Sequence, residues 1–575
     1  MIGWLLNVVL GFTDGIRDSS RHTWPARQCA ARMQAANAGL MIVTASMGMD
    51  FALHSVDQVN LKTTGQYHDK LKHRKKLRVG VMARLGKKEG GLFLGIVLLM
   101  GQVVADPCFD MYKQTNFERA VEPGLVIGAT KDVPEHCVVR GVVNRSIRFE
   151  LRMPTATWNG RFLMMGTGGS SGYIAPTDTE LARGFAVSST DTGHDGNDPS
   201  YAAQPEAAID YAFRAVHLIA LTSKELIQSF YRDDIKYSYY QGCSNGGRQG
   251  MIEATRFPDD FDGIVAGAPA FQIAKEFFLW TTAVYRAQRA NPLEKEQLVL
   301  LGNASRTACD ELDGVQDGVI NDPRKCTLDR FDPADLMCTT NQNSKTCLSK
   351  GQLETVRTHY RGVVDSDGNV LSPGLLPGAE GAGDWAMYGL SGGVIPTTGE
   401  KLTTSIVELA SVGHLRYWVY NDPTYDPDEF DIFDDRDDLE RSSAILDVNT
   451  ADLKAFREAG SKILMYQGWN DYLLRPQRAV KYREEVVAAN GGEHSTDDFF
   501  RLYMVPGMMH CSRGPGAWDI DYLGPLVDWV EKGDAPEYLL GSQPDAGFTR
   551  RHCAYPKLAV YRGGDNSKAA SFACQ

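Results

Sequence analysis

Hydrophobic and polar positions follow two regular patterns along residues 161–270. Four short runs have the composition of buried strands: "RFLMMG", "FAVSSTD", "IKYSYYQG" and "FDGIVAGAP". Apolar residues recur at helical spacing in "EAAIDYAFRAVHLIALTSKELIQSFY" and in "RQGMIEATRFP", where Pro258 ends the pattern. Strands that alternate with helices in this way predict an α/β fold, in which a mostly parallel sheet is covered on both faces.

The heptapeptide "QGCSNGG", residues 241–247, lies between a predicted strand and a predicted helix. Gly242, Ser244 and Gly246 fit the pattern G-x-S-x-G, in which a strained turn exposes the serine hydroxyl. The glycines are needed because the strand and helix backbones approach too closely for a Cβ atom. The motif therefore predicts that Ser244 is a catalytic nucleophile.

A nucleophilic serine needs a base and an acid, which follow it in the order acid, then histidine, in α/β-hydrolases. Asp471 ends the apolar run "KILMYQGWND", and His510 follows the run "RLYMVPGMMH" in a Gly-containing loop. Each residue alone is typical of an ordinary turn or surface loop, but their order and their positions at strand ends indicate a triad. We expect the oxyanion to be bound by the Asn245 N–H and by that of Gly168 or Gly169.

The N-terminal region has the pattern of a targeting segment. Arg84, Lys87 and Lys88 precede an apolar run at 91–100, and Val103 and Ala105 have the spacing of a signal-peptidase site. The alternative is a buried helix or a membrane anchor, although the run is short for a bilayer. We predict a signal peptide at 82–105, an over-extended gene model at 1–81, and a secreted or periplasmic mature chain with no membrane attachment.

Charge and cysteine content fit an exported protein. The whole chain has a net charge of −12, and removal of its basic first 105 residues makes the remainder more acidic, which argues against nucleic acid as a partner. An even set of cysteines in an exported chain predicts five disulfides. A zinc site is the alternative, but no CxxC pair occurs. The ten cysteines are Cys108, Cys137, Cys243, Cys309, Cys326, Cys338, Cys347, Cys511, Cys553 and Cys574.

One of these disulfides is predicted from the positions of two cysteines. Cys243 directly precedes Ser244, and Cys511 directly follows His510. A bond between them would tie the nucleophile turn to the histidine loop and restrict the geometry between base and nucleophile.

The segment "CDELDGVQDGVINDPRKC", residues 309–326, has the composition of a calcium loop. Carboxylates and carbonyls are the hard ligands that Ca²⁺ prefers, although no Glu closes the loop as in an EF-hand. An acidic solvated turn is the alternative, but Cys309 and Cys326 resemble a clasp around the loop. The candidate ligands of this structural Ca²⁺ are Asp310, Asp313, Val315, Asp317 and Val319.

Over nearly all of residues 106–575 the sequence resembles the tannase and feruloyl esterase family. The resemblance rests on "GCSNGG", "GWND", "HC", "WNGRFLMMGTGGSSG", "STDTGH" and "RYWVYNDPTYD". It implies an α/β-hydrolase fold, with a catalytic domain at 106–269 and 451–575 and an inserted lid domain at 270–450. It also implies calcium at the acidic loop, no organic cofactor, and a disulfide between the cysteines that flank the serine and the histidine.

The resemblance implies a serine esterase that cleaves small aromatic esters with a hydroxycinnamoyl, galloyl or related acyl group. Trp385 and Arg416 of the lid are candidate substrate-binding residues. The Trp385 ring could stack on the aromatic acyl group, and Arg416 could bind a free carboxylate of the substrate. The family also contains mono(2-hydroxyethyl) terephthalate hydrolase, so that activity is an alternative. A serine peptidase on the same fold and a non-catalytic, calcium-stabilised binding module are the remaining alternatives.

Overall fold

The computed structural model describes residues 106–340, 342, 344–392 and 401–575, which belong to one compact unit. The predicted signal peptide and the segment before it lie outside these residues. In the part of the chain that the structure describes, no helix is both long and apolar enough to cross a membrane.

A ten-stranded mixed sheet forms the centre of the molecule, in the order β1-β3-β4-β6-β5-β7-β8-β11-β12 with β2 beside β3. From β6 to β12 the neighbouring strands are parallel, whereas β1 to β4 pair antiparallel at one edge. The strands are β1 (Arg119–Val121), β2 (Leu125–Ile127), β3 (His136–Val143), β4 (Ile147–Pro154), β5 (Arg161–Met165), β6 (Ala186–Thr190), β7 (Tyr237–Cys243), β8 (Gly263–Gly267), β11 (Lys462–Gly468) and β12 (Phe500–Val505).

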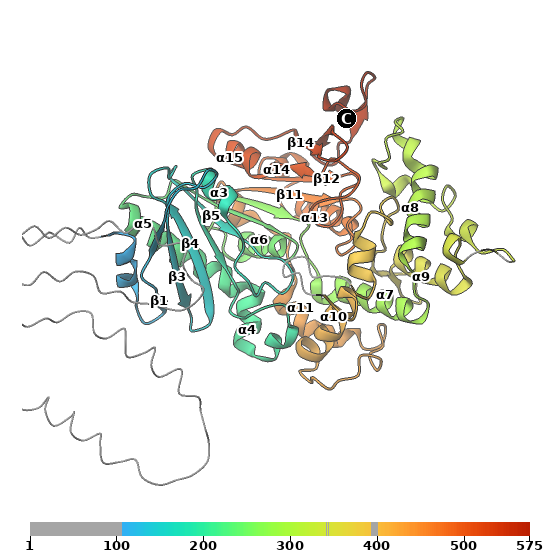
Figure 1. The fold of residues 1–575 in the computed structure, drawn as a ribbon, viewed down its shortest axis with the longest axis horizontal. Helices are drawn as coiled ribbons and strands as arrows, with labels where there is room; N and C mark the ends of the chain where they lie inside the picture. Colours follow the sequence, from blue (N-terminus) through green and yellow to red (C-terminus); the bar gives the residue numbers. More distant parts are fainter. Residues whose placement is uncertain (1–105, 341, 343, 393–400) are drawn as a thin grey trace, which may run out of the picture. The chain divides into compact units, whose positions relative to one another are not determined.

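Helices cover both faces of this sheet (Figure 1), as the alternating pattern predicted. Apolar residues of α5, α6 and α13 pack on one face, and those of α3 and α15 pack on the other. The helices around the sheet are α3 (Asp178–Ala182), α4 (Pro205–Ile209), α5 (Ala215–Tyr231), α6 (Asn245–Arg256), α12 (Lys454–Glu458), α13 (Pro476–Ala489), α14 (Glu493–Asp497) and α15 (Leu523–Lys532).

The long helical pattern at 206–231 is not one regular helix. Between α4 and α5 the chain forms a π-helix, η3 (Asp210–Arg214). The carbonyls of Tyr211 and Ala212 accept hydrogen bonds from the buried side chain of Arg248. A π-turn frees carbonyls from the regular helical hydrogen bonds, so this contact with Arg248 accounts for the irregularity.

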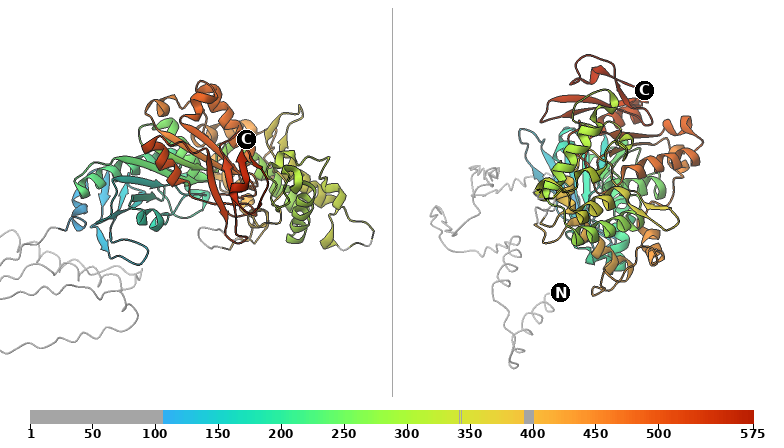
Figure 2. Two further views of the ribbon diagram at one scale, coloured as in Figure 1. Left: turned by 90° about the horizontal axis from the view of Figure 1, so that it is seen from above. Right: turned by 90° about the vertical axis from the view of Figure 1, so that its right-hand side faces the viewer.

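The chain between β8 and β11 forms a largely helical insertion at one end of the sheet (Figure 1). The left view of Figure 2 shows the insertion beside the sheet from another side. Trp280, Leu301 and Trp385 belong to a hydrophobic core of its own. The insertion contains α7 (Phe278–Ala290), α8 (Lys295–Cys309), α9 (Lys350–Arg361), β9 (Val363–Val364), β10 (Val370–Ser372), α10 (Ile406–Gly413) and α11 (Glu440–Leu446).

The C-terminal part adds two small sheets, and all ten cysteines of 106–575 form disulfides. The sheets consist of β13 (Asp519–Ile520), β14 (Tyr538–Gln543) and β15 (Phe548–Cys553), and of β16 (Ala559–Tyr561) and β17 (Phe572–Cys574). The prediction of five disulfides is confirmed by the pairs Cys108–Cys137, Cys243–Cys511, Cys309–Cys326, Cys338–Cys347 and Cys553–Cys574.

Candidate active site

Ser244 occupies a sharp turn between β7 and α6. Its backbone has φ 65° and ψ −123°, a conformation that residues other than glycine rarely adopt. A Cβ atom on Gly242 would lie 2.7 Å from the carbonyl carbon of Gly246, and one on Gly247 would lie 2.2 Å from the carbonyl oxygen of Gly267. Glycine is therefore required on both sides of Ser244, and the turn presents the serine hydroxyl to the cavity described below.

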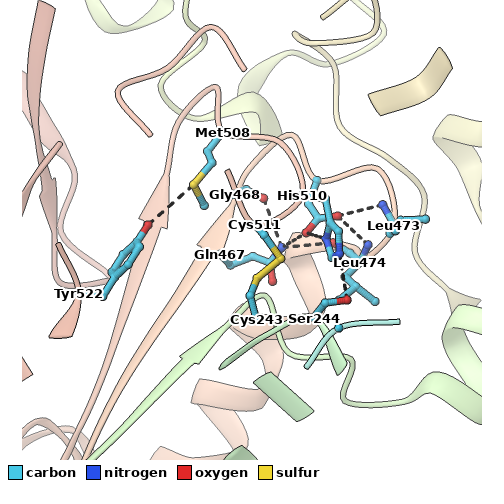
Figure 3. Close-up of a disulfide and its surroundings, with 12 residues drawn as sticks. Cys243, Ser244, Gln467, Gly468, Leu473, Leu474, Met508, His510, Cys511 and Tyr522 are labelled. Atoms are coloured by element: carbon cyan, nitrogen blue, oxygen red, sulfur yellow. Dashed lines mark hydrogen bonds and ion pairs between the residues drawn. A yellow bond between two sulfur atoms is a disulfide. The ribbon is translucent and has the colours of Figure 1, made fainter. Parts of the chain in front are cut away.

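The structure brings the three predicted triad residues together. His510 Nε2 is 3.0 Å from Ser244 Oγ, and His510 Nδ1 is 2.8 Å from Asp471 Oδ2. Ser244, Asp471 and His510 follow strands β7, β11 and β12, respectively. The sheet ends in the order β7-β8-β11-β12, so only β8 lies between these strands. Figure 3 shows Ser244 and His510 joined by this hydrogen bond. The chain can thus move a proton from the serine to the imidazole.

The Asp471 carboxylate is held by four groups. Its Oδ1 accepts the N–H groups of Leu473 at 2.9 Å and Leu474 at 2.8 Å. Its Oδ2 accepts a hydrogen bond from Gln467 Nε2 at 2.9 Å, in addition to the one from His510. Because a carboxylate with these donors can only accept, His510 must carry its proton on Nδ1, which leaves Nε2 free to accept the Ser244 proton.

The charge of Asp471 also changes the acidity of His510. Burial alone would lower the pKa of this imidazole, but the charge and hydrogen bond of Asp471, together with the charge of Asp384, raise it above its usual value. The imidazolium that forms during acyl transfer is therefore stabilised relative to an isolated buried histidine.

Backbone N–H groups next to Ser244 form the candidate oxyanion hole. The Asn245 N–H belongs to the first turn of α6, where helical N–H groups have no helical acceptor. Gly168 and Gly169 line the same cavity as Ser244. The Gly168 N–H donates to Tyr173 Oη at 3.2 Å, whereas the Gly169 N–H has no acceptor among the described residues. Of the two predicted glycines, Gly169 is thus the one with a free donor.

A buried arginine next to the candidate oxyanion hole was not predicted from the sequence. It is Arg248, which directly follows the heptapeptide 241–247. Arg248 is fully buried, and its Nε donates to Asn245 Oδ1 at 2.8 Å. Asn245 Nδ2 in turn donates to Ser171 Oγ at 2.6 Å and to the Thr167 carbonyl at 3.3 Å. Arg248 therefore links the turn after Ser244 to the loop that carries Gly168 and Gly169.

The triad opens into a cavity of about 530 Å³ with mainly apolar walls. Ser244, Asn245 and His510 lie on its catalytic side. Apolar and aromatic side chains from both the sheet region and the insertion line much of the rest: Tyr173, Tyr201, Tyr211, Phe277, Phe278, Tyr388, Ile406, Leu409 and Trp418. A cavity with this lining suits an aromatic ligand.

The family model described as tannase and feruloyl esterase matches residues 132–575. The chain belongs to this family. A probable feruloyl esterase B-2 of Aspergillus fumigatus is 33% identical over 441 residues, which cover 71% of this chain and 80% of the relative. A probable feruloyl esterase B-1 of Aspergillus terreus is 34% identical over 439 residues, covering 71% and 79%.

Three solved esterase and tannase structures have a similar fold. An esterase from Aspergillus oryzae gives a TM-score of 0.72 at 29% identity, and it covers 82% of this chain and 99% of its own. Feruloyl esterase B from Aspergillus oryzae gives 0.70 at 27%, with the same coverage. Tannin acyl hydrolase from Aspergillus niger, at 24% identity and a TM-score of 0.63, supports the fold. The predicted α/β-hydrolase fold is confirmed, and the chain is a carboxylic ester hydrolase of aromatic esters.

The two predicted substrate-binding residues of the insertion do not line the cavity. Trp385 is buried in the core of the insertion, where its ring stacks on His359 at 4.6 Å. The Arg416 side chain donates to the Tyr425 carbonyl at 3.0 Å. Both predictions are wrong because the short π-helices that carry these residues direct them into the insertion, whereas Tyr388 and Trp418 on the same π-helices face the cavity.

The predicted disulfide between Cys243 and Cys511 joins the nucleophile turn to the histidine loop of this esterase (Figure 3). It spans 268 residues of sequence. We expect replacement of both cysteines by serine to lower kcat by about 10- to 100-fold, because small displacements of a base from its nucleophile cost orders of magnitude in rate. Steady-state kinetics with an aryl ester measure this effect.

The matched control is replacement of Cys553 and Cys574, which form a disulfide of the C-terminal region. Both double variants lose one cross-link, and thermal unfolding gives the stability loss of each. If the Cys243/Cys511 variant keeps full kcat, or if the control loses as much, the disulfide has no specific effect on the triad.

The predicted calcium loop is closed by the Cys309–Cys326 disulfide. Burial, and then the charges of Asp317 and Asp310, raise the pKa of Asp313 to about 6. Asp317 forms an ion pair with Arg550, so a cation would compete with this guanidinium. Three carboxylates and two carbonyls on one closed loop nevertheless have the donor chemistry that Ca²⁺ needs, so the residues fit the ion.

A further cluster of titratable groups joins α5, α6 and the chain before β8. The candidate ligand atoms of His217, Glu253 and Asp260 all lie within 4.8 Å of one another. Burial, and then the charge of Asp260, raise the pKa of Glu253 well above its usual range. His217 Nδ1 lies 2.6 Å from Asp260 Oδ2, and Lys224 donates to the Asp260 carbonyl. His217 and Lys224 thus already contact Asp260, and none of these residues lines the cavity.

Proposed function

We propose that this esterase hydrolyses hydroxycinnamoyl, galloyl or related aromatic esters through an acyl-enzyme. The observation that carries the proposal is a hydrogen-bonded Ser244–His510–Asp471 triad at one side of an aromatic-lined cavity of about 530 Å³. The relatives at 33–34% identity are named as probable feruloyl esterases, which supports an aromatic acyl group.

In the first half-reaction, Ser244 Oγ attacks the ester carbonyl while His510 Nε2 takes its proton. The carbonyl oxygen becomes an oxyanion, which accepts hydrogen bonds from the N–H groups of Asn245 and Gly169. His510 then gives the proton to the leaving alcohol, and the acyl group remains on Ser244. Asp471 holds the imidazole in its productive tautomer throughout.

In the second half-reaction, water attacks the acyl-enzyme in the same geometry. His510 takes the proton of the water, the oxyanion forms in the same hole, and the collapse of the intermediate returns the proton to Ser244. The products are an aromatic acid and the free enzyme, and the chemistry uses no organic cofactor.

Hydrolysis of mono(2-hydroxyethyl) terephthalate is a second candidate, because a cation lines the cavity. Arg513 follows His510 by three residues, and its side chain is 44% exposed. Its nearest anionic partner, Asp384, is 3.7 Å away. A partly exposed guanidinium suits the free carboxylate of a dicarboxylic monoester.

Hydrolysis of a panel of methyl ferulate, methyl gallate and mono(2-hydroxyethyl) terephthalate tests the proposal, with Ser244→Ala as the control. We expect the natural chain to cleave one of the methyl esters most efficiently. Highest kcat/KM for the terephthalate monoester would favour the second candidate. If Ser244 reacts with a fluorophosphonate but no aromatic ester is cleaved, the substrate proposal fails while the triad stands.

The pH dependence of kcat/KM reports the protonation of His510 in the free enzyme. Only neutral His510 can accept the Ser244 proton, and Asp471 raises the pKa of this imidazole above its usual value. We therefore expect activity to fall as the pH decreases through a midpoint above about 6.5. A pH series of kcat/KM for a non-ionising ester measures it, and a midpoint well below that value would contradict this assignment.

We propose that the chain is exported to the periplasm or the medium. Ten cysteines in five disulfides need an oxidising compartment to form and persist.

We also propose that Asp310, Asp313 and Asp317, with the carbonyls of Val315 and Val319, bind a structural Ca²⁺. Ion binding to the folded chain alone would stabilise it by mass action. We expect EDTA to lower the melting temperature and added Ca²⁺ to restore it, with Asp313→Ala insensitive to both. Differential scanning calorimetry with Mg²⁺ as the control ion measures the shift. An unchanged melting temperature after chelation would refute the site.

A further inference from the structure

A segment of the insertion, residues 377–389, contacts both loops that carry the acid and the base. On the acid side, the contact involves Asn470, the residue before Asp471. Its Nδ2 donates to the Pro377 carbonyl at 3.0 Å. The rings of Trp385 and Tyr388 lie 5.6 and 6.4 Å from the ring of Tyr472, which directly follows Asp471. The segment therefore packs on the residues at both sides of the triad acid.

On the base side, the contact is a direct hydrogen bond to the catalytic histidine. The His510 N–H donates to Asp384 Oδ2 at 2.7 Å, across 126 residues of sequence. Asp384 is 1% exposed, and its second oxygen, Oδ1, has no hydrogen-bond partner among the described residues. Burying a carboxylate costs free energy unless hydrogen bonds or ion pairs compensate it. The hydrogen bond from the His510 N–H therefore stabilises Asp384 at this position.

The same segment also contacts the imidazole ring and the residues after it. Tyr388 meets the His510 ring edge to face at 5.9 Å. Arg513 Nη2 lies 3.7 Å from Asp384 Oδ1 and 3.7 Å from Met387 Sδ. The charged or titratable groups that face His510 are thus Asp471 from the acid loop, Asp384 and Tyr388 from the insertion, and Arg513 from its own loop.

We propose that Asp384 is a positioning residue for His510. Its carboxylate fixes the backbone of the histidine loop, while Asp471 fixes the imidazole. On this view the insertion does more than bind the substrate, because it completes the geometry of the triad. The chemistry should therefore depend on Asp384 even for an ester too small to reach the rest of the insertion.

The test compares Asp384→Ala and Asp384→Asn in the full chain, with p-nitrophenyl acetate as the small ester. Alanine removes the acceptor of the His510 N–H, whereas the asparagine carbonyl can still accept it but carries no charge. The matched controls are Asp447→Ala and Asp447→Asn. Asp447 is also 1% exposed, lies in the insertion and accepts one backbone N–H, from Ala274 at 2.9 Å, but it does not line the cavity.

For Asp384→Ala we expect kcat to fall by about 10- to 100-fold with KM changed less than about twofold, because a displaced base affects the chemical step rather than binding. For Asp384→Asn we expect kcat to stay within about threefold of the natural chain, while the acid limb of kcat/KM moves to lower pH because one negative charge near the imidazolium is lost. The Asp447 variants should show neither change.

Full kcat in a folded Asp384→Ala variant would overturn the proposal, and so would an equal loss in Asp447→Ala. If Asp384→Ala fails to fold by circular dichroism, the asparagine variant decides: because it keeps the acceptor and loses the charge, a kcat lowered by about tenfold or more would overturn the proposal. The proposed substrate class is not at issue in this test, because p-nitrophenyl acetate has no aromatic acyl group.

Discussion

Replacement of Ser244 by alanine is expected to lower kcat by about a million-fold, the loss typical of removing the nucleophile of such a triad. The Ser244 hydroxyl is the one group at this turn that lies 3.0 Å from His510 Nε2, so no neighbouring side chain can replace it in that contact. Single-turnover kinetics with an aryl ester, together with fluorophosphonate labelling, measure the loss. Retention of more than about a hundredth of the activity would contradict the role of Ser244 as nucleophile.

The backbone of Ser244 adds a stability difference that an ordinary surface serine would not show. Its φ of 65° and ψ of −123° are unfavourable for alanine but accessible to glycine. Ser244→Gly and Ser244→Ala should therefore be equally inactive, but the glycine variant should be more stable by about 1 kcal/mol. Urea unfolding of both variants measures the difference. A less stable glycine variant would show that the turn holds no such strain.

Replacement of Asp471 by asparagine is expected to lower kcat by about 10⁴-fold, while the fold is retained. The N–H groups of Leu473 and Leu474 both point at Oδ1, so an asparagine would place its oxygen there and its NH₂ group toward His510. An NH₂ group cannot accept the Nδ1 proton of His510. The imidazole must then carry its proton on Nε2, where it can no longer accept the proton of Ser244.

Steady-state kinetics and thermal unfolding of Asp471→Asn check this expectation. Asp447→Asn, the same change at a buried aspartate that is not part of the triad, is the control. A loss of less than about tenfold in Asp471→Asn would show that His510 keeps its productive tautomer without the carboxylate.

Much of the fold and of the triad could be predicted from local patterns. The strands that end at Cys243, Gly468 and Val505 are short apolar runs, and each is followed within five residues by Ser244, Asp471 or His510. A parallel sheet brings the carboxyl ends of its strands to one edge, so residues at three strand ends meet without any knowledge of side-chain packing. For the same reason Cys243 and Cys511 could be paired from their positions alone.

The pocket residues could not be predicted in this way. Trp385 and Tyr388 lie three residues apart on one π-helix and both belong to the core of the insertion, yet only Tyr388 also lines the cavity. Aromatic composition does not distinguish these two environments, because both bury a large ring. The π-helices that set the direction of each side chain have no clear signature in the sequence.

The sequence by itself determined the alternation of strands and helices, the strained serine turn, the acid and the histidine, because each depends on a short run of residues and on the geometry of a parallel sheet. Only the tertiary structure decided which groups support them. Asp384 meets His510 across 126 residues, and Arg248 bonds the Leu446 carbonyl across 198. These contacts form where an insertion packs on the catalytic loops. No local pattern records such packing, since it depends on how distant segments together bury their polar groups.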